Sequence, residues 1–236
     1  MNLYIRTVRS AIKAYPAVIP HLKGRARWVA FAMGGEYKTY DYYLQQITRL
    51  ITSVYNGNLG GEFIDIMATL IQGQIYQAVN QAWLDSGMDG SLPDYLASLA
   101  DDIVLGQYEH VDQLYRDIID ARLDGTPLAP LLARAPLWAT RWTEAYNQAM
   151  LLIAAEMGQR MVWELGATEQ HCETCAALNG IVAFASEWEE LGVMPQSAPN
   201  DALQCGGWKC DCKLTPTEQR RSPDAYGRII NATVKL

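Results

Sequence analysis

Residues 171–180 read HCETCAALNG, and residues 205–214 read CGGWKCDCKL. Together they hold all five cysteines of the 236-residue chain: Cys172, Cys175, Cys205, Cys210 and Cys212. A Cys-x-x-Cys turn presents two thiolates to one ion, and zinc in structural sites takes four nitrogen or sulfur ligands at the corners of a tetrahedron. The spacing therefore predicts a structural zinc site that joins two distant segments of the chain.

Four of the five thiols suffice for one zinc ion. The set that we expect is Cys172, Cys175, Cys205 and Cys210. The glycines Gly206 and Gly207 would let the backbone turn tightly after Cys205. In an extended segment Cys210 and Cys212 face the same side with alpha carbons about 6.5–7 Å apart. Cys212 is therefore the first alternative to Cys210 as the fourth zinc ligand, and His171 is a less favoured alternative.

Two other interpretations of the cysteines stay open. A redox Cys-x-x-Cys pair would lie just after a strand, at the start of a helix. Unligated cysteines would be buried in the core. An odd number of cysteines argues against a closed disulfide framework, and residues 1–20 lack the apolar stretch and cleavage site of a signal peptide. We therefore expect a reducing compartment.

The first two thirds of the chain has the periodicity of amphipathic helices. The predicted helices cover residues 3–14, 17–33, 41–55, 61–86, 94–122 and 137–158. In the fourth, an apolar stripe from Met67 through Ile71 and Ile75 predicts a core face, with Gln72 and Asn80 on the opposite side.

Composition excludes several classes of protein. Half of the residues are hydrophobic and 19% are charged, which fits a buried core and not a disordered chain, a coiled-coil rod or a collagen-like repeat. The uncharged run at residues 66–84 is long enough to suggest a membrane span, but it contains five side-chain amides. Burying these in hydrocarbon would be too costly, so no span is expected.

After Gly158 the pattern changes to that of a small mixed unit. Strands are predicted at residues 160–165 and 180–184, and a last strand at 226–236. Ser186 and Glu189 fit a capping box at the start of a short helix. The proline-bearing segment 124–136 is the expected linker. The fold class is therefore α+β: a mostly helical part at residues 1–124, followed by a zinc-clamped α+β module at 125–236.

Charge is distributed unevenly along the chain. The net charge is −7, yet residues 1–35 carry six Lys or Arg and no Asp or Glu. Such a basic leader suits contact with DNA or with an acidic partner, but an ordinary solvated helix face or a targeting segment would have the same pattern.

The order of motifs in the C-terminal half resembles the phage Mu F-like family of minor head (head morphogenesis) proteins. The runs that carry the resemblance are RWTEAYN at 141–147, VWEL at 162–165, HCETCAALNG at 171–180 and CDCKL at 210–214. That family typically has an Arg-Thr-Glu-like helix, a Trp-bearing strand, Cys-x-x-Cys leading to Leu-x-Gly, and His-Pro-x-Cys-Arg-Cys before an apolar strand. The resemblance covers residues 137–216. The usual His is absent, and Cys205 stands five residues before Cys210 in its place.

The resemblance implies a non-enzymatic structural protein of a bacteriophage. Such a protein acts in head morphogenesis near the portal vertex, in the virion and in the host cytoplasm during assembly. Its partners would be the portal or major capsid protein, and an alternative role is contact with packaged or ejected DNA through the basic leader, with no membrane involved. A similarity of this fold to ADP-ribosyltransferases also raises an effector enzyme. No catalytic residues are predicted, because the acids of residues 187–190 look like helix-surface groups and His21, His110 and His171 are scattered.

Overall fold

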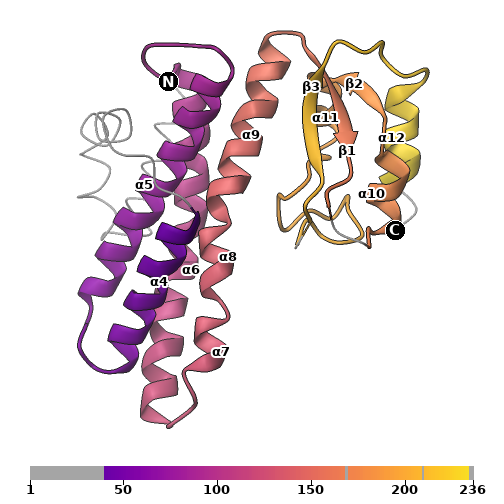
Figure 1. Cartoon of the computed structure of the whole chain (residues 1–236). Coiled ribbons are helices and arrows are strands. Elements are labelled where there is room, and N and C mark those ends of the chain that lie inside the picture. Colours follow the sequence, from indigo (N-terminus) through magenta and orange to yellow (C-terminus); the bar gives the residue numbers. More distant parts are fainter. Residues whose placement is uncertain (1–39, 168–169, 209, 234–236) are drawn as a thin grey trace. The chain divides into compact units, whose positions relative to one another are not determined.

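The computed structural model describes residues 40–167, 170–208 and 210–233. Over these residues the protein is mostly helical, with a small antiparallel sheet near the C-terminal end, as an α+β fold requires (Figure 1). They form two compact units, one of residues 40–81 and 91–142, the other of residues 82–90 and 143–233. The basic leader, with the helices predicted at residues 3–14 and 17–33, lies outside the described residues.

The units divide after Trp142, whereas the sequence suggested a boundary after residue 124. The predicted linker at residues 124–136 contains the short helix α7 (Ala129–Leu132) and the start of α8 (Ala135–Ala139). Pro130 and Pro136 stand in the first turn of these two helices. Proline is well tolerated there because the first amides of a helix have no partner within it. The prolines thus begin helices and do not mark an extended linker.

Three longer helices build most of the first unit: α4 (Tyr40–Tyr55), α5 (Glu62–Asp85) and α6 (Asp94–Leu123). They confirm the helices predicted at residues 41–55, 61–86 and 94–122. In α4 the buried side chains recur every three to four residues, as Tyr43, Ile47, Ile51 and Val54. Their regular spacing explains why the ends of this helix were predictable from the sequence.

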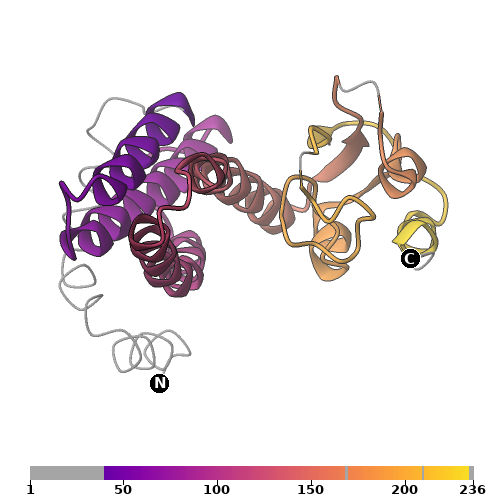
Figure 2. The same cartoon turned by 90° about the horizontal axis from the view of Figure 1, so that it is seen from below.

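Helix α5 is buried on its polar side as well as on its apolar stripe. Gln74 donates a 2.7 Å hydrogen bond to the Ala139 carbonyl of α8. Gln77 accepts one of 2.7 Å from the Tyr43 hydroxyl of α4, and the Tyr76 hydroxyl donates to Asp101 of α6. Helix α5 therefore bonds to three other helices of the unit, α4, α6 and α8, which Figures 1 and 2 show from two sides. Among the described helices, none has the length and apolar character needed to cross a bilayer.

The second unit is built on a three-stranded sheet. Strand β1 (Arg160–Glu164) lies between β2 (Val182–Phe184) and β3 (Lys213–Thr217), and both pairings are antiparallel. Val162 is opposite Val182 on one side and Thr215 on the other. The strands predicted at residues 160–165 and 180–184 are confirmed, and β3 directly follows the last cysteine.

Helices α9 (Arg141–Glu156), α10 (Glu173–Leu178), α11 (Ala185–Glu190) and α12 (Ala225–Thr233) complete this unit. The strand predicted at residues 226–236 is wrong, because α12 occupies most of that range. Ala225 and Ile229 are four residues apart and both buried, which is the spacing of a helix face. The helix predicted at 137–158 is also divided: α8 ends at Ala139 and α9 begins at Arg141.

Two tryptophans form the centre of the second core. Trp163 of β1 and Trp188 of α11 are both fully buried, with ring centroids 5.8 Å apart. The capping box predicted on Ser186 and Glu189 is wrong by two residues, since it is the Glu187 carboxylate that accepts a 2.9 Å hydrogen bond from the Phe184 amide. That bond fixes the start of α11, and with it the position of Trp188.

Candidate metal centre

The cysteines come together from the first turn of α10 and from the loop that leads into β3. Cys172 is the N-cap of α10 and Cys175 lies within it. The Cys175 Sγ atom is 4.0 Å from Cys205 Sγ and 3.9 Å from Cys210 Sγ. Two thiolates on one tetrahedral zinc ion, with zinc–sulfur bonds of about 2.3 Å, lie about 3.8 Å apart. These sulfur atoms therefore have the spacing of metal ligands.

All five cysteines predicted as ligands belong to this cluster. Within the described residues, three groups have ligand atoms within 4.8 Å of one another: Cys172 with Cys175 and Cys205, Cys175 with Cys210 and Cys212, and His171 with Asp211 and Cys212. The cluster could therefore hold a metal ion. His171, expected to be a distant contender, has its Nδ1 atom 3.9 Å from Cys212 Sγ. Asp211 was missed, because nothing in its position between two cysteines marks a ligand.

Backbone amides point at several of the sulfur atoms. The Cys175 amide donates to Cys172 Sγ over 3.4 Å, and the Cys205 amide donates to the same sulfur. The amide of Gly207 donates to Cys205, and that of Gly166 to Cys212. Hydrogen bonds to the charged form favour it, so these amides stabilise thiolates.

Two glycines let the backbone approach the cluster closely. Gly207 has φ of +75°, and a Cβ atom there would lie 2.6 Å from the Ser197 carbonyl oxygen. The tight turn predicted at Gly206 and Gly207 is thus confirmed. At Gly166 a Cβ atom would lie 2.0 Å from Cγ of Asp211. Sequence reasoning missed Gly166, since only the fold shows that the segment after β1 passes beside residue 211.

The thiols differ in acidity. A hydrogen bond from Cys175 lowers the pKa of Cys210 to about 5, against the opposing effect of burial. The same hydrogen bond, together with burial, raises the pKa of Cys175. Burial chiefly raises the pKa of Cys205 to about 11. In the absence of a metal ion the Cys210 thiolate is therefore stabilised by the Cys175 thiol, and a bound cation would displace protons from Cys175 and Cys205.

Further contacts tie the two cysteine segments and the sheet together. The Glu173 amide donates to the Gln204 side chain over 2.8 Å, and the Gln204 amide donates to the buried Thr174 hydroxyl over 3.3 Å. On the other side of α10, the Gly180 amide donates to the Trp163 carbonyl over 2.9 Å. The cluster is thus attached to the central strand β1 and does not depend on flexible loops alone.

The arrangement favours a metal site over the two alternatives. A redox pair needs only Cys172 and Cys175, yet Cys205 and Cys210 also lie at contact distance from the Cys175 sulfur. Cysteines that simply fill a core would be enclosed, whereas Cys172, Cys205 and Cys210 are only partly buried. Several thiols that converge from separate segments, with amides aimed at their sulfur atoms, are typical of metal centres.

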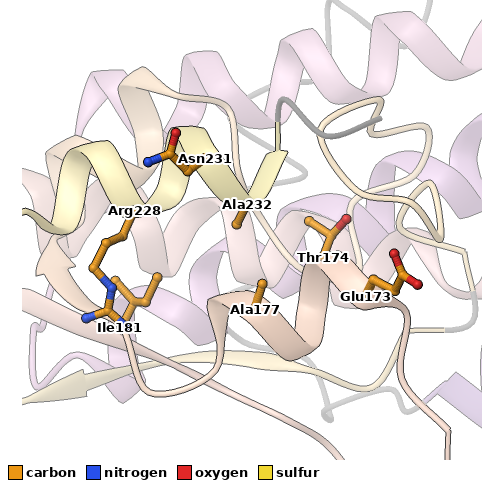
Figure 3. A pocket seen from close by; sticks show the side chains of 7 residues that line it. All are labelled: Glu173, Thr174, Ala177, Ile181, Arg228, Asn231 and Ala232. Carbon is orange, nitrogen blue, oxygen red and sulfur yellow. The ribbon is translucent and has the colours of Figure 1, made fainter.

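A pocket of about 310 Å³ lies beside the cluster, between α10 and α12 (Figure 3). Its polar walls include Glu173 and Thr174 from α10 and Arg228 and Asn231 from α12. Ala177, Ile181 and Ala232 form its apolar walls, so with Glu173 and Arg228 the pocket is chemically mixed. The structure gives it no group that would define a reaction.

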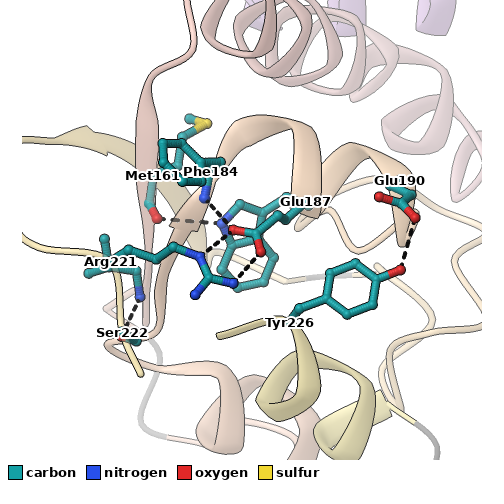
Figure 4. A network of polar contacts seen from close by, with 9 residues as sticks. Met161, Phe184, Glu187, Glu190, Arg221, Ser222 and Tyr226 are labelled. Atoms are coloured by element: carbon teal, nitrogen blue, oxygen red, sulfur yellow. Dashed lines mark hydrogen bonds and ion pairs between the residues drawn. The ribbon is translucent and has the colours of Figure 1, made fainter. Parts of the chain in front are cut away.

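A polar network attaches the C-terminal helix to α11 (Figure 4). Arg221 Nε donates a 2.9 Å hydrogen bond to Glu187, and its Nη2 atom also pairs with that carboxylate. Ser222 donates its amide to the Val182 carbonyl and accepts from the Val182 amide. The Tyr226 hydroxyl donates to Glu190 over 2.9 Å. Two of the acids expected to be plain surface groups, Glu187 and Glu190, thus hold the tail in place.

No protein-family model, curated protein or solved structure matches the chain.

Proposed function

We propose that the chain is a bacteriophage minor head protein of the Mu F-like type. In this proposal it acts in head morphogenesis near the portal vertex, and structural zinc holds its C-terminal module together. The helical unit would dock on the portal or on the inner capsid. The role is one of assembly and not of catalysis.

The observation that supports the proposal is the convergence of the motif residues. The Trp-bearing strand, the Cys-x-x-Cys helix, the Leu-Asn-Gly turn and the final Cys-x-Cys lie in one compact unit, in the order of the family. The Gly180 amide of the turn bonds to Trp163 of the strand, and Cys175 lies 3.9 Å from Cys210. These contacts hold the motifs together around the candidate metal centre.

Zinc is the metal that this donor set favours. Thiolates are soft ligands, and four-coordinate sites built from cysteines typically take zinc. A module of this size has a limited hydrophobic core, so the free energy of metal binding contributes directly to folding. The proposed DNA-contacting alternative depends on the basic leader at residues 1–35, and it stays a prediction.

The proposal can be tested with the full chain co-expressed with the portal protein of the same genome. We expect affinity purification and native mass spectrometry to show a complex in which each copy of the chain carries zinc. Cys175→Ser should lose both the zinc and the complex, whereas Gly106→Ala, in α6 with open space around it, should keep both. If the zinc-loaded chain binds neither portal nor capsid protein, the proposed role in head assembly is wrong. A metal-free chain would remove the zinc clamp.

A further inference from the structure

We propose that the cysteine centre holds two metal ions, with the Cys175 thiolate bridging them. This inference rests on the proposed metal binding and deepens it, because it concerns the number of ions. The first ion would lie among Cys172, Cys175 and Cys205, and the second among Cys175, Cys210, Cys212 and His171.

The grouping of the ligand atoms carries the inference. One tetrahedral ion needs four ligand atoms that all lie at about 3.6–3.8 Å from one another. Over the part of the chain that the structure describes, the cysteine sulfur atoms instead form two triads within 4.8 Å, and Cys175 is their common member. Its sulfur lies 4.0 Å from Cys205 in one triad and 3.9 Å from Cys210 in the other. Cys175 is buried, with 1% of its surface exposed, as is Cys212, whereas Cys172, Cys205 and Cys210 are only partly buried.

A fourth ligand lies beside the second triad, at Cys212. His171 Nδ1 is 3.9 Å from Cys212 Sγ, close to the separation of about 3.6 Å that nitrogen and sulfur have on one zinc ion. It groups within 4.8 Å with Cys212 and Asp211 and not with Cys175 and Cys210, so its side chain would have to turn toward the second ion to bind it. The first triad supplies three thiolates, which leaves one position for an exchangeable ligand, as in zinc sites with three protein ligands. Two ions that share one thiolate also account for the odd number of cysteines, all of which then bind metal.

Charge is compatible with this arrangement. Five thiolates and two divalent cations leave one negative charge, and the thiols that are still protonated release their protons to solvent as the ions bind. The amides of Gly166 and Gly207 donate to Cys212 and Cys205, one in each triad, and so reduce the cost of that charge. His171 would bind as the neutral imidazole.

Metal stoichiometry tests the inference on the full chain. The chain is loaded with zinc, freed of excess ion, and examined by native mass spectrometry and elemental analysis. We expect two zinc ions per chain, and one in the double variant His171→Ala/Cys212→Ser, which leaves the second ion with only Cys175 and Cys210. The matched control is His110→Ala, an exposed histidine on α6 that should leave two ions bound. Far-UV circular dichroism of each variant establishes that it has folded.

A second measurement needs no variant. After exchange of zinc for ¹¹³Cd, a shared thiolate should give two cadmium resonances that are split by coupling between the two nuclei. One ion per chain would overturn the inference and leave the single zinc clamp standing. Two ions in the double variant His171→Ala/Cys212→Ser would also overturn it, because the second ion would then lie elsewhere. Two cadmium resonances without coupling would show that the two ions do not share the Cys175 thiolate. A chain that binds no metal would overturn the proposed zinc clamp as well.

Discussion

The Sγ atoms of Cys175 and Cys205 lie 4.0 Å apart, although the two residues are 30 positions apart in the sequence. The contact joins α10 to the loop that returns toward β3, so it closes a long segment that includes β2 and α11. Closing a loop of this length costs conformational entropy, which the interactions of the cluster must offset. The cysteine centre is therefore the point at which a bound ion would stabilise the second unit.

Removing the metal should loosen the second unit and leave the first intact. Treatment with a strong chelator, or Cys175→Ser, deprives the unit of binding free energy that is also folding free energy. By hydrogen exchange read by mass spectrometry, amides of β1, β2 and β3 should exchange at least about tenfold faster, which corresponds to about 1.4 kcal/mol. Amides of α5 between residues 62 and 81 should be unchanged, because they belong to the other unit.

The control for this experiment is Ser186→Ala, an exposed hydroxyl in the same unit. It should exchange like the unaltered chain. Equal protection of β1 with and without chelator would show that the cluster does not stabilise the sheet.

The two central tryptophans should matter far more than an exposed one. Trp188 is fully buried against Trp163 and donates its indole N–H to the Met161 carbonyl over 3.4 Å. Trp188→Ala should lower the free energy of unfolding of the second unit by about 3–5 kcal/mol. Trp208→Ala removes a side chain that is 43% exposed and should cost less than about 0.5 kcal/mol. Urea unfolding compares the two, and similar losses would contradict the assigned core.

How far the sequence alone predicts this fold depends on the length and regularity of each pattern. The helices α4, α5 and α6 were predictable because their apolar residues recur over many turns. The tail at residues 226–236 contains a short β-branched run that fits a strand or a helix equally well, and only packing against the unit selects the helix. The break between α8 and α9 was not predictable, because Pro136 lies in the first turn of a helix that ends three residues later, at Ala139.

The sequence predicted which residue types would bind the metal, but it did not predict which residues would lie next to one another in the site. Cysteine spacing pointed to all five thiols, because a Cys-x-x-Cys turn has a known bite. The approach of His171 to Cys212, the hydrogen bond from the Gly166 amide and the place of Cys175 in both triads all depend on tertiary contacts between segments at least 30 residues apart. No local pattern encodes such contacts. Glu187 was read as a surface acid for the same reason, since its partner Arg221 lies on another segment.

Gly166→Ala should damage the metal centre without touching a ligand. A methyl group there would fall 2.0 Å from Cγ and 2.3 Å from the carbonyl oxygen of Asp211, so the segment between Cys210 and Cys212 must move. We expect the free energy of unfolding to fall by about 1–3 kcal/mol. We also expect a lower affinity for zinc, which competition with a chromogenic chelator measures. Gly106→Ala is the matched control: it has open space in α6 and should stabilise the helix by about 0.5–1 kcal/mol. Unchanged zinc affinity in Gly166→Ala would contradict the close approach.

The ion pair of Glu187 with Arg221 should make the second unit less stable in acid. The Arg221 guanidinium and the Phe184 amide hold the pKa of Glu187 below its ordinary range, although burial opposes them. A carboxyl group whose pKa is lowered on folding stabilises the fold above its unfolded pKa of about 4.3. The contribution is then lost as the pH falls through the lower folded value. Glu187→Gln should therefore cost about 1–2 kcal/mol at pH 7, and the difference from the unaltered chain should shrink toward pH 3.

Urea unfolding at matched pH values measures this difference, because proton effects common to all chains cancel in each comparison. Glu189→Gln serves as the control, since Glu189 is exposed on the same helix and should differ little from the unaltered chain at any pH. Arg221→Met should reproduce the loss at pH 7, because it removes the same ion pair from the other side. A penalty for Glu187→Gln that stays constant from pH 7 to pH 3 would mean that the carboxylate charge does not hold α11 to the tail. In that case the Phe184 amide alone would explain the position of Glu187.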